Sequence, residues 1–315
     1  MGKNHFRVLS SNSEVRVAHL ADPLVDSSMK ELEGIDCHQD YKSIPCDQID
    51  GAVIAAPTEL HHEIGKHFLG QGVSLLLEKP VASTESQANE LYELAREKKA
   101  SLCVGHVERS NPAVKKLKEV LKSGFVGKAL HFSFTRVGGY PQNVKEGNNV
   151  LLDLAVHDLD VLNFLHGEFS FKASVCHNSV IKDIPDTAEI LLTSPHGCSA
   201  TIHTNWITPT KIRKLRVTGT KGVCTVDYML QSCELLGGNL LNQTPKADFT
   251  YQELQMHYRS PDKIEFGVAK EEPLKNQLKE WIKALKGQDH SLCSAVEAAY
   301  AVKLAEKAIQ KRSSF

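Results

Sequence analysis

Short apolar runs separated by amphipathic stretches fill the first third of the chain, and this alternation constrains the fold most strongly. The runs are residues 15–21, 51–56, 73–77 and 101–105. Between the last three lie two helical patterns, residues 61–69 and 83–99, the second with Ser83 or Thr84 as a predicted cap. Strands that are apolar throughout and alternate with helices form parallel sheets covered on both faces. We therefore predict a doubly wound α/β domain over residues 1–110.

The pattern changes beyond this region and predicts a second, α+β domain over residues 111–315. Predicted helices cover residues 112–123, 150–165, 275–286 and 294–311, and a first strand covers residues 130–137. Further predicted strands are residues 169–175, 187–193, 199–206, 214–219, 223–227 and 231–236. This order favours an open-faced, mostly antiparallel sheet with helices on one face. The last helix can pack back on the first domain, and polar residues 239–262 are predicted to contain a mobile loop.

Composition excludes several classes of function. The 315 residues carry 37 Lys and Arg against 38 Asp and Glu, so no basic face for nucleic acid is expected. No apolar run approaches the roughly 20 residues that cross a bilayer, and the chain does not open with a secretory signal. The eight cysteines are scattered without a C-x-x-C pair, which predicts free thiols in a reducing cytoplasm and no metal centre.

Polar residues follow the predicted strands of the first domain, where parallel sheets bind ligands. Asp22 ends the first run and can accept hydrogen bonds from both ribose hydroxyls of an adenosine, although a solvated turn aspartate before Pro23 is the simpler interpretation. Lys79 follows the third run and precedes Pro80, which restricts its backbone. This position favours a rigidly held lysine at the mouth of a crevice over an ordinary surface lysine.

Three titratable residues lie in the apolar helix predicted over residues 150–165. Asp153, His157 and Asp160 are spaced i, i+4 and i+7, so they share one helix face. Burying them costs several kcal/mol, roughly, unless they are paired. The stripe is therefore either a satisfied buried network or the wall of an active site, and titratable clusters favour the second. A histidine beside a carboxylate is the usual general base near neutral pH.

At this point the chain resembles the Gfo/Idh/MocA family of nicotinamide-dependent sugar oxidoreductases. The resemblance rests on Val53-Ile54-Ala55-Ala56-Pro57-Thr58 with His61, and on Leu76-Leu77-Glu78-Lys79-Pro80. It also rests on Asp153-x-x-x-His157-Asp158-x-Asp160 and on Val217-x-Gly219-x-x-Gly222. Within the family, the segment from Val104 to Pro112 is similar to UDP-N-acetylglucosamine 3-dehydrogenases.

The resemblance implies a Rossmann domain and an open-faced sheet domain that forms homodimers or homotetramers. It implies Lys79, Asp153 and His157 as the catalytic set, acting on a sugar or nucleotide sugar. The position of Asp160, one turn beyond His157, indicates an orienting or packing role. The predicted cofactor-binding residues are Gly2, Asp22, Pro57, Thr58, His61, Glu78 and Lys79. NAD is favoured over NADP, because the carboxylate of Asp22 repels a 2′-phosphate.

The beginning of the chain departs from the family pattern. Gly2 matches the last glycine of the G-x-G-x-x-G turn, and Asp22 lies 20 residues further on, which is the spacing expected for the ribose-binding acid. The first strand and the first two glycines are then expected to be missing, through a late start codon or a true truncation. A catalytically silent remnant that only binds a sugar or a partner is the alternative function. An in-frame strand and G-x-G encoded upstream of Met1 would favour the enzyme.

Overall fold

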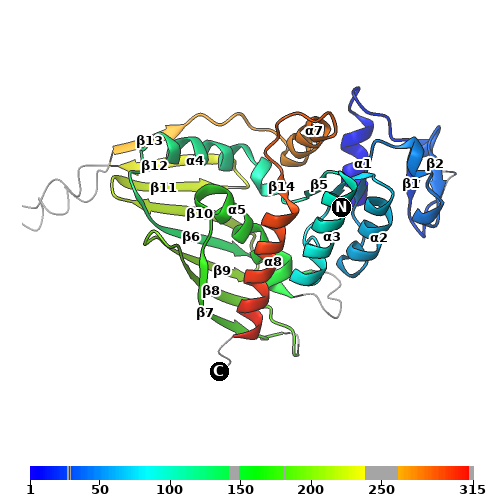
Figure 1. The fold of residues 1–315 in the computed structure, drawn as a ribbon. Helices are drawn as coiled ribbons and strands as arrows, with labels where there is room; N and C mark the ends of the chain where they lie inside the picture. The colour runs from blue at the N-terminus through cyan, green and yellow to red at the C-terminus, as the bar shows by residue number, and fades with distance from the viewer. Residues whose placement is uncertain (27, 29, 142–148, 181, 238–261, 312–315) are drawn as a thin grey trace, which may run out of the picture. The chain divides into compact units, whose positions relative to one another are not determined.

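The structure is a computed structural model that describes residues 1–26, 28, 30–141, 149–180, 182–237 and 262–311 (Figure 1). The chain divides into two units, the first formed by Met1–Ser110 with Glu272–Lys303 and the second by Asn111–Glu271 with Leu304–Phe315. The sequence predicts two domains, residues 1–110 and 111–315. Glu272–Lys303, however, joins the first unit, although the sequence prediction had placed these residues in the second domain. The predicted loop over residues 239–262 lies, except for its last residue, outside the described residues.

Three short parallel strands organise the first unit. They are β3 (Gly51–Ile54), β4 (Ser74–Leu77) and β5 (Leu102–Val104), and the two-residue strand β14 (Cys293–Ser294) pairs antiparallel with β5. The strands β3, β4 and β5 each lie inside a predicted apolar run, and each strand is shorter than its run. The predicted parallel α/β sheet is confirmed.

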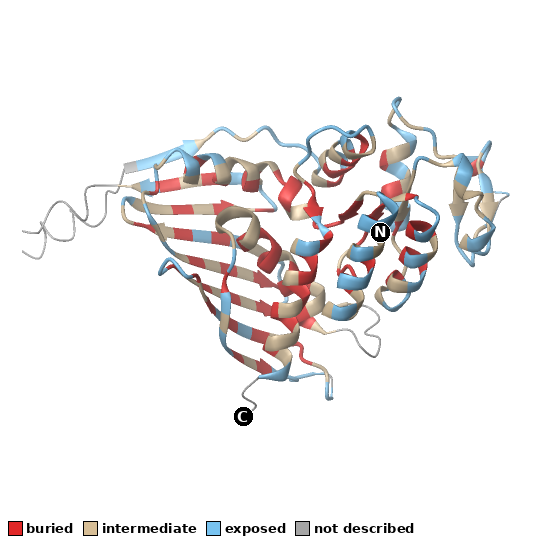
Figure 2. Cartoon of the chain, in the orientation of Figure 1, coloured by how far each residue is buried: buried red, intermediate tan, exposed pale blue. Residues whose placement is uncertain are grey.

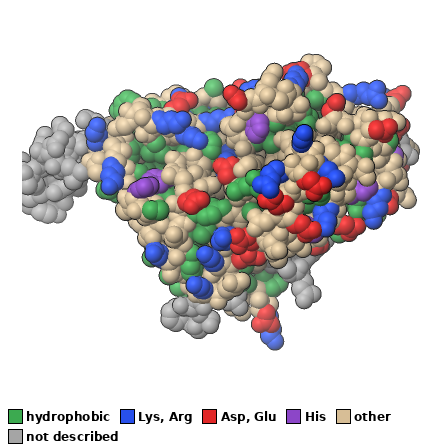
Figure 3. Space-filling model, in the orientation of Figure 1, with side chains coloured by type: hydrophobic (Ala, Val, Ile, Leu, Met, Phe, Trp, Pro, Cys, Tyr) green, Lys and Arg blue, Asp and Glu red, His purple; other side chains and the backbone are tan. Residues whose placement is uncertain are grey.

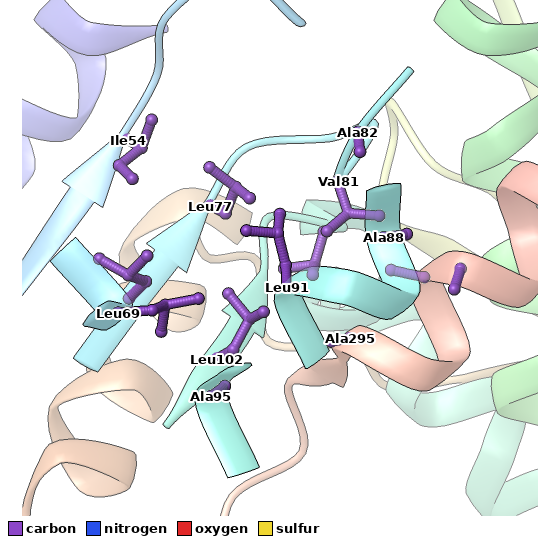
Figure 4. Close-up of a cluster of buried hydrophobic side chains, with 14 of the residues drawn as sticks. Ile54, Leu69, Leu77, Val81, Ala82, Ala88, Leu91, Ala95, Leu102 and Ala295 are labelled. Atoms are coloured by element: carbon purple, nitrogen blue, oxygen red, sulfur yellow. The ribbon is translucent and has the colours of Figure 1, made fainter. Parts of the chain in front are cut away.

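Helices cover one face of this sheet. Leu75 and Leu77 point to the face where α2 (Thr58–Gly70), α3 (Glu85–Lys98) and the start of α8 (Ala295–Gln310) pack. Figure 4 shows this cluster, with Leu77, Leu91 and Leu102 close together. The hydroxyl of Thr84 accepts a hydrogen bond from the Gln87 N–H at 3.2 Å, so Thr84 caps α3, one of the two residues predicted to do so.

The opposite face is covered as well. Leu76 and Cys103 point to a second buried cluster, formed with Val8 of α1 (Gly2–Ser10) and with Leu278 and Trp281 of α7 (Pro273–Leu285). Because successive strand residues face opposite sides, an all-apolar strand needs cover on both. The run Leu75-Leu76-Leu77 meets this condition, since all three side chains are fully buried.

Two further parallel strands form a separate sheet in the first unit. β1 (His19–Ala21) pairs with β2 (Asp36–His38), and no pairing joins β1 to β3 in the part of the chain that the structure describes. In the doubly wound strand order 3-2-1-4-5-6, strands β2 and β1 take positions 3 and 2, and β3 to β5 take positions 4 to 6. Position 1, between β1 and β3, has no strand among the described residues. The 3-10 turns among the unit's described residues are η1 (Lys30–Leu32), η2 (Tyr41–Ser43), η3 (Cys46–Gln48) and η4 (Val107–Ser110).

The second unit is built on an eight-stranded sheet of order β13-β12-β11-β10-β6-β9-β8-β7. The strands are β6 (Ala129–Val137), β7 (Ser170–His177), β8 (Thr187–Thr193), β9 (Ser199–Asn205), β10 (Ile212–Gly219), β11 (Gly222–Asp227), β12 (Ser232–Gly237) and β13 (Asp262–Phe266). Only β6 and β9 pair in parallel in this sheet as described. The predicted mostly antiparallel sheet is therefore confirmed, with β13 as an additional edge strand.

One face of this sheet is apolar and the other is open. Phe132 and Phe134 of β6 and Ile190 and Leu192 of β8 are buried, whereas alternate residues such as Leu191 stay exposed (Figure 2). Among the described residues of the unit, the α-helices are α4 (Pro112–Lys122), capped by the Asn111 side chain, α5 (Val156–His166) and the end of α8 from Leu304.

Surface charge follows the composition. On the face drawn in Figure 3, Lys and Arg side chains are interspersed with Asp and Glu rather than gathered into a field of one sign. Among the described helices, none combines the length and the apolar character needed to cross a bilayer.

The position between β1 and β3 predicts a large gain in stability from an added strand. A variant extended before Met1 by an apolar strand and a G-x-G turn should melt at a higher temperature and respond more strongly to NAD. Burying about five more apolar side chains at roughly 1.5–3 kcal/mol each contributes on the order of 10 kcal/mol. Thermal melting of both forms with and without NAD measures this. Equal melting temperatures and equal NAD responses would show that the position is filled in another way.

Candidate active site

The carboxyl ends of β3, β4 and β5 lie level at one edge of the first unit's sheet. Ile54 is paired with Leu77, and Leu77 with Val104, so the three strands end side by side. Backbone hydrogen bonds continue past the strands: Glu78 N–H donates to the Ile54 carbonyl at 2.9 Å, and Gly105 N–H donates to the Leu77 carbonyl at 2.7 Å. The residues that follow these strands therefore share one edge, which is where open α/β sheets bind ligands.

Lys79 leaves β4 at this edge and is partly buried. Its backbone N–H donates to the Oε2 atom of Glu78 at 3.2 Å. The structure thus places Lys79 just after the carboxyl end of β4, and the sequence predicted this lysine to follow the third apolar run.

Glu78 points into the protein and is only 6% exposed. Its Oε1 atom lies 2.7 Å from Nε2 of His5, which is 2% exposed and comes from α1. Gly105 makes room for the carboxylate, because a Cβ atom there would lie 3.1 Å from both Cδ and Oε1 of Glu78. Burial alone would raise the pKa of Glu78, but the hydrogen bond and charge of His5 and the Lys79 N–H outweigh burial and lower it.

His61 sits inside α2 and is 1% exposed. Its Nδ1 atom lies 2.8 Å from the Pro80 carbonyl oxygen, and its Nε2 atom lies 2.8 Å from the Ala56 carbonyl oxygen. The side chains of His61 and Glu78, both predicted to bind cofactor, are thus engaged with the protein itself.

The remaining predicted cofactor residues lie closer to solvent. Asp22 is exposed just after β1, and its Oδ1 atom accepts a hydrogen bond from the Leu24 N–H at 2.8 Å. Pro57 is exposed and Thr58 partly exposed, directly after β3 at the start of α2. Gly2 is the first residue of α1, with open space where a Cβ would stand. Exposed carboxylate oxygens and a helix N-terminus fit the ribose and phosphate groups of a dinucleotide.

The predicted titratable stripe of the second unit does not lie on one regular helix. Its first part, η5 (Leu151–Ala155), is a π-helical turn, and α5 begins only at Val156. A π turn holds an extra residue, so Asp153 is rotated around the axis from the position that α-helical spacing assumes. His157 is partly exposed and Asp160 is fully buried, both within α5. The indole N–H of buried Trp206 donates to Oδ2 of Asp153 at 3.0 Å.

Sequence reasoning missed a buried ion pair in the second unit. Nε of Arg136 donates to Oδ1 of Asp158 at 2.9 Å, and the two side chains are 4% and 2% exposed. The guanidinium carbon also lies 5.1 Å from the ring centroid of Tyr228. An arginine in an apolar strand and an aspartate in an apolar helix were the available signal, because each buried charge needs a partner.

Within the first unit, the structure brings Pro57, Thr58, His61, Glu78 and Lys79 to one sheet edge. In the second unit, Asp153 lies on η5, and His157 and Asp160 lie on α5.

The lowered pKa of Glu78 predicts a pH dependence of stability. A carboxylate with a depressed pKa in the folded state contributes stability above its ordinary value of 4.5, and this contribution is lost as the pH falls. The free energy of unfolding should therefore drop more steeply below pH 4.5 in the unmodified protein than in Glu78→Gln. Urea denaturation across this range measures the difference. The exposed Glu63→Gln is the control, because solvent screens its pair with Lys42. If the free energy of unfolding changes with pH in the same way in the unmodified protein and in Glu78→Gln, the lowered pKa of Glu78 does not contribute to stability.

Two family models match the chain. The model "Oxidoreductase family, NAD-binding Rossmann fold" matches residues 1–106, and "GFO/IDH/MocA C-terminal domain" matches residues 114–225. The rhizopine catabolism protein MocA of Rhizobium meliloti is 26% identical over 64% of this chain and 67% of its own length. Inositol 2-dehydrogenase of Rhizobium meliloti (strain 1021) is 24% identical over 79% of both chains.

A solved structure shows the same fold over nearly the whole chain. UDP-N-acetylglucosamine 3-dehydrogenase from Acidithiobacillus ferrooxidans superposes with a TM-score of 0.80 at 18% identity, covering 99% of this chain and 94% of that one. Two of these proteins are named as dehydrogenases, one of inositol and one of UDP-N-acetylglucosamine, and the family model that matches residues 1–106 is NAD-binding. Both domains of this chain are therefore those of the Gfo/Idh/MocA family of NAD-binding oxidoreductases, and the chain belongs to that family.

Proposed function

We propose that the protein oxidises a secondary hydroxyl of a sugar or nucleotide sugar with NAD, and that a UDP-N-acetylhexosamine is a candidate substrate. The observation that carries this proposal is the level sheet edge, at which Lys79 stands beside the residues that follow β3. The names of the relatives, among them an inositol dehydrogenase and a UDP-N-acetylglucosamine dehydrogenase, support the substrate class.

Each proposed role follows from the chemistry of the side chain. His157 accepts the hydroxyl proton on a ring nitrogen as the general base. The ammonium of Lys79 stabilises charge that develops on the same oxygen. Asp153 stabilises the protonated form of His157. Asp160 orients that histidine or has a packing role in α5. When bound, NAD supplies the acceptor for the hydride. Asp22 and the start of α1 at Gly2 would hold its ribose and phosphate groups, with Pro57 and Thr58 at the sheet edge.

Two further properties belong to this proposal. The open face of the second unit's sheet exposes Leu191, which supports assembly into a homodimer or homotetramer through that sheet. All eight cysteines lie among the described residues and outside any disulfide, which supports a cytoplasmic location. Sedimentation velocity of the protein tests the first property.

Substrate oxidation is tested directly with purified protein and NAD. The panel contains UDP-N-acetylglucosamine, UDP-N-acetylgalactosamine, UDP-glucose, myo-inositol and levoglucosan, and NADH formation is followed by absorbance. Turnover of one member supports the proposal and names the substrate. Binding of a panel sugar without NADH formation would favour a catalytically silent binding protein.

Replacing the proposed base or lysine should abolish most turnover. Lys79→Ala and His157→Ala should each lose at least about a hundredfold in kcat, the usual contribution of a positioned acid or base. NAD binding should survive in His157→Ala. The loss of kcat in Asp160→Asn should be smaller than in either alanine variant. The control is Lys66→Ala, an exposed lysine of α2 paired with Glu90. Unchanged kcat in either variant removes that residue from the mechanism, and loss of folding in His157→Ala would indicate a structural network instead.

Cofactor preference should depend on Asp22. The protein should bind NAD more tightly than NADP, since a carboxylate repels the 2′-phosphate, and Asp22→Ala should narrow the preference. Titration of both cofactors by intrinsic fluorescence measures the two affinities, with the exposed Asp26→Ala as the control. Tighter binding of NADP by the unmodified protein would show that Asp22 does not contact the ribose.

A further inference from the structure

Two buried histidines hold the residues on either side of Lys79. Before it, the Glu78 carboxylate lies 2.7 Å from Nε2 of His5. After it, the Pro80 carbonyl oxygen lies 2.8 Å from Nδ1 of His61. The two imidazoles come from different helices of the first unit, α1 and α2. The lysine is thus the central residue of a three-residue segment anchored at both ends.

The contacts of His61 connect two strand ends. Its ring lies between the Pro80 carbonyl, which follows β4, and the Ala56 carbonyl, which follows β3, at 2.8 Å from each. A carbonyl oxygen only accepts hydrogen bonds, so the neutral ring satisfies one carbonyl at a time and the protonated ring satisfies both. In either form, the imidazole fixes the segment after β4 against the segment after β3.

The contact of His5 acts through the carboxylate of Glu78. One oxygen of that carboxylate faces His5, and the other accepts the backbone N–H of Lys79 at 3.2 Å. The hydrogen-bonded series from the His5 imidazole through the Glu78 carboxylate therefore ends at the backbone N–H of Lys79. Gly105 leaves the space that this carboxylate fills, so three separate parts of the first unit contribute to one arrangement.

Burying imidazole rings costs free energy that an apolar side chain of similar size would not cost. At both positions the ring instead carries a hydrogen bond to a neighbour of Lys79. The ammonium of a lysine sits at the end of a flexible four-carbon stem, and a mobile backbone would add to the freedom of that stem. Small displacements of a reacting group reduce turnover strongly.

We propose that His5, through Glu78, and His61 are positioning residues that fix the backbone of Lys79 for turnover. The inference rests on the role of Lys79 in the proposed function. It replaces direct cofactor contact as the role of the Glu78 and His61 side chains, and it adds His5, which no sequence motif had singled out.

Amide hydrogen exchange of Lys79 tests the positioning without a substrate. His5→Leu and His61→Leu should each speed exchange of this amide by about tenfold or more, because the segment opens locally. The amide of His5→Gln can still reach Glu78, so that variant should retain protection. The control is His62→Gln, a neighbouring surface histidine of α2 that contacts Glu90.

Two substitutions at His61 separate its two contacts. The side-chain nitrogen of asparagine replaces Nδ1, and that of glutamine replaces Nε2. His61→Asn should therefore keep the Pro80 contact and the slow exchange of Lys79, whereas His61→Gln should keep only the Ala56 contact and exchange faster. If the leucine variants do not fold, the comparison of His61→Asn with His61→Gln decides whether His61 positions Lys79. Equal exchange in both, or unchanged exchange in folded leucine variants, would overturn the proposal.

Turnover with NAD and UDP-N-acetylglucosamine, or with the panel sugar that forms NADH, gives a second readout. His61→Gln should lower kcat by about tenfold to a hundredfold and change KM and NAD affinity little, because the lysine is displaced rather than the ligands. In a Lys79→Ala background the same substitution should add no further loss, and an equal additional loss would overturn the proposal. Unchanged turnover in Lys79→Ala alone would refute the proposed function, and the exchange results would still decide the positioning of the segment.

Discussion

The register in which β3, β4 and β5 pair is the constraint on which the candidate site depends. Because Ile54, Leu77 and Val104 stand level, the chain leaves all three strands at one edge, and Glu78 lies beside Gly105. A shift of one residue in β4 would turn its buried leucines to the wrong faces, since successive side chains alternate. The two apolar clusters on either side of the sheet therefore fix where Lys79 stands.

The polar groups behind this edge follow from the same packing. Once helices cover both faces, a carboxylate such as Glu78 has no water to face and must find a donor inside the protein. His5 and the Lys79 amide provide it, and His61 does the same for two carbonyls that have left the strand ladder. The same logic in the second unit pairs Arg136 with Asp158. Polar residues at these positions therefore stabilise the fold and shape the site together.

Much of this arrangement could be predicted from the sequence, because the strongest signals are local. The all-apolar run at Leu75–Leu77, the cap at Thr84 and the strand predicted over residues 187–193 each reflect forces among near neighbours, and the corresponding elements formed. The family motifs likewise predicted the fold that the comparisons confirm. What the sequence did not predict depends on distant partners. The π turn at Asp153 lies against Trp206, 53 residues further along, and β14 forms only because β5 offers an edge. His5 gave no signal, because its partner Glu78 is 73 residues away.

The discontinuity of the first unit has a consequence for synthesis of the protein. The face of its sheet that meets α1 is closed by α7, and the free edge of β5 is closed by β14, yet both elements follow every strand of the second unit in the sequence. A ribosome thus completes the eight-stranded sheet before it makes the residues that cover Leu76 and Cys103. Domains generally fold in the order of synthesis. Here neither unit completes its packing early: the first needs α7 and β14, and the second needs the end of α8 from Leu304, which follows both.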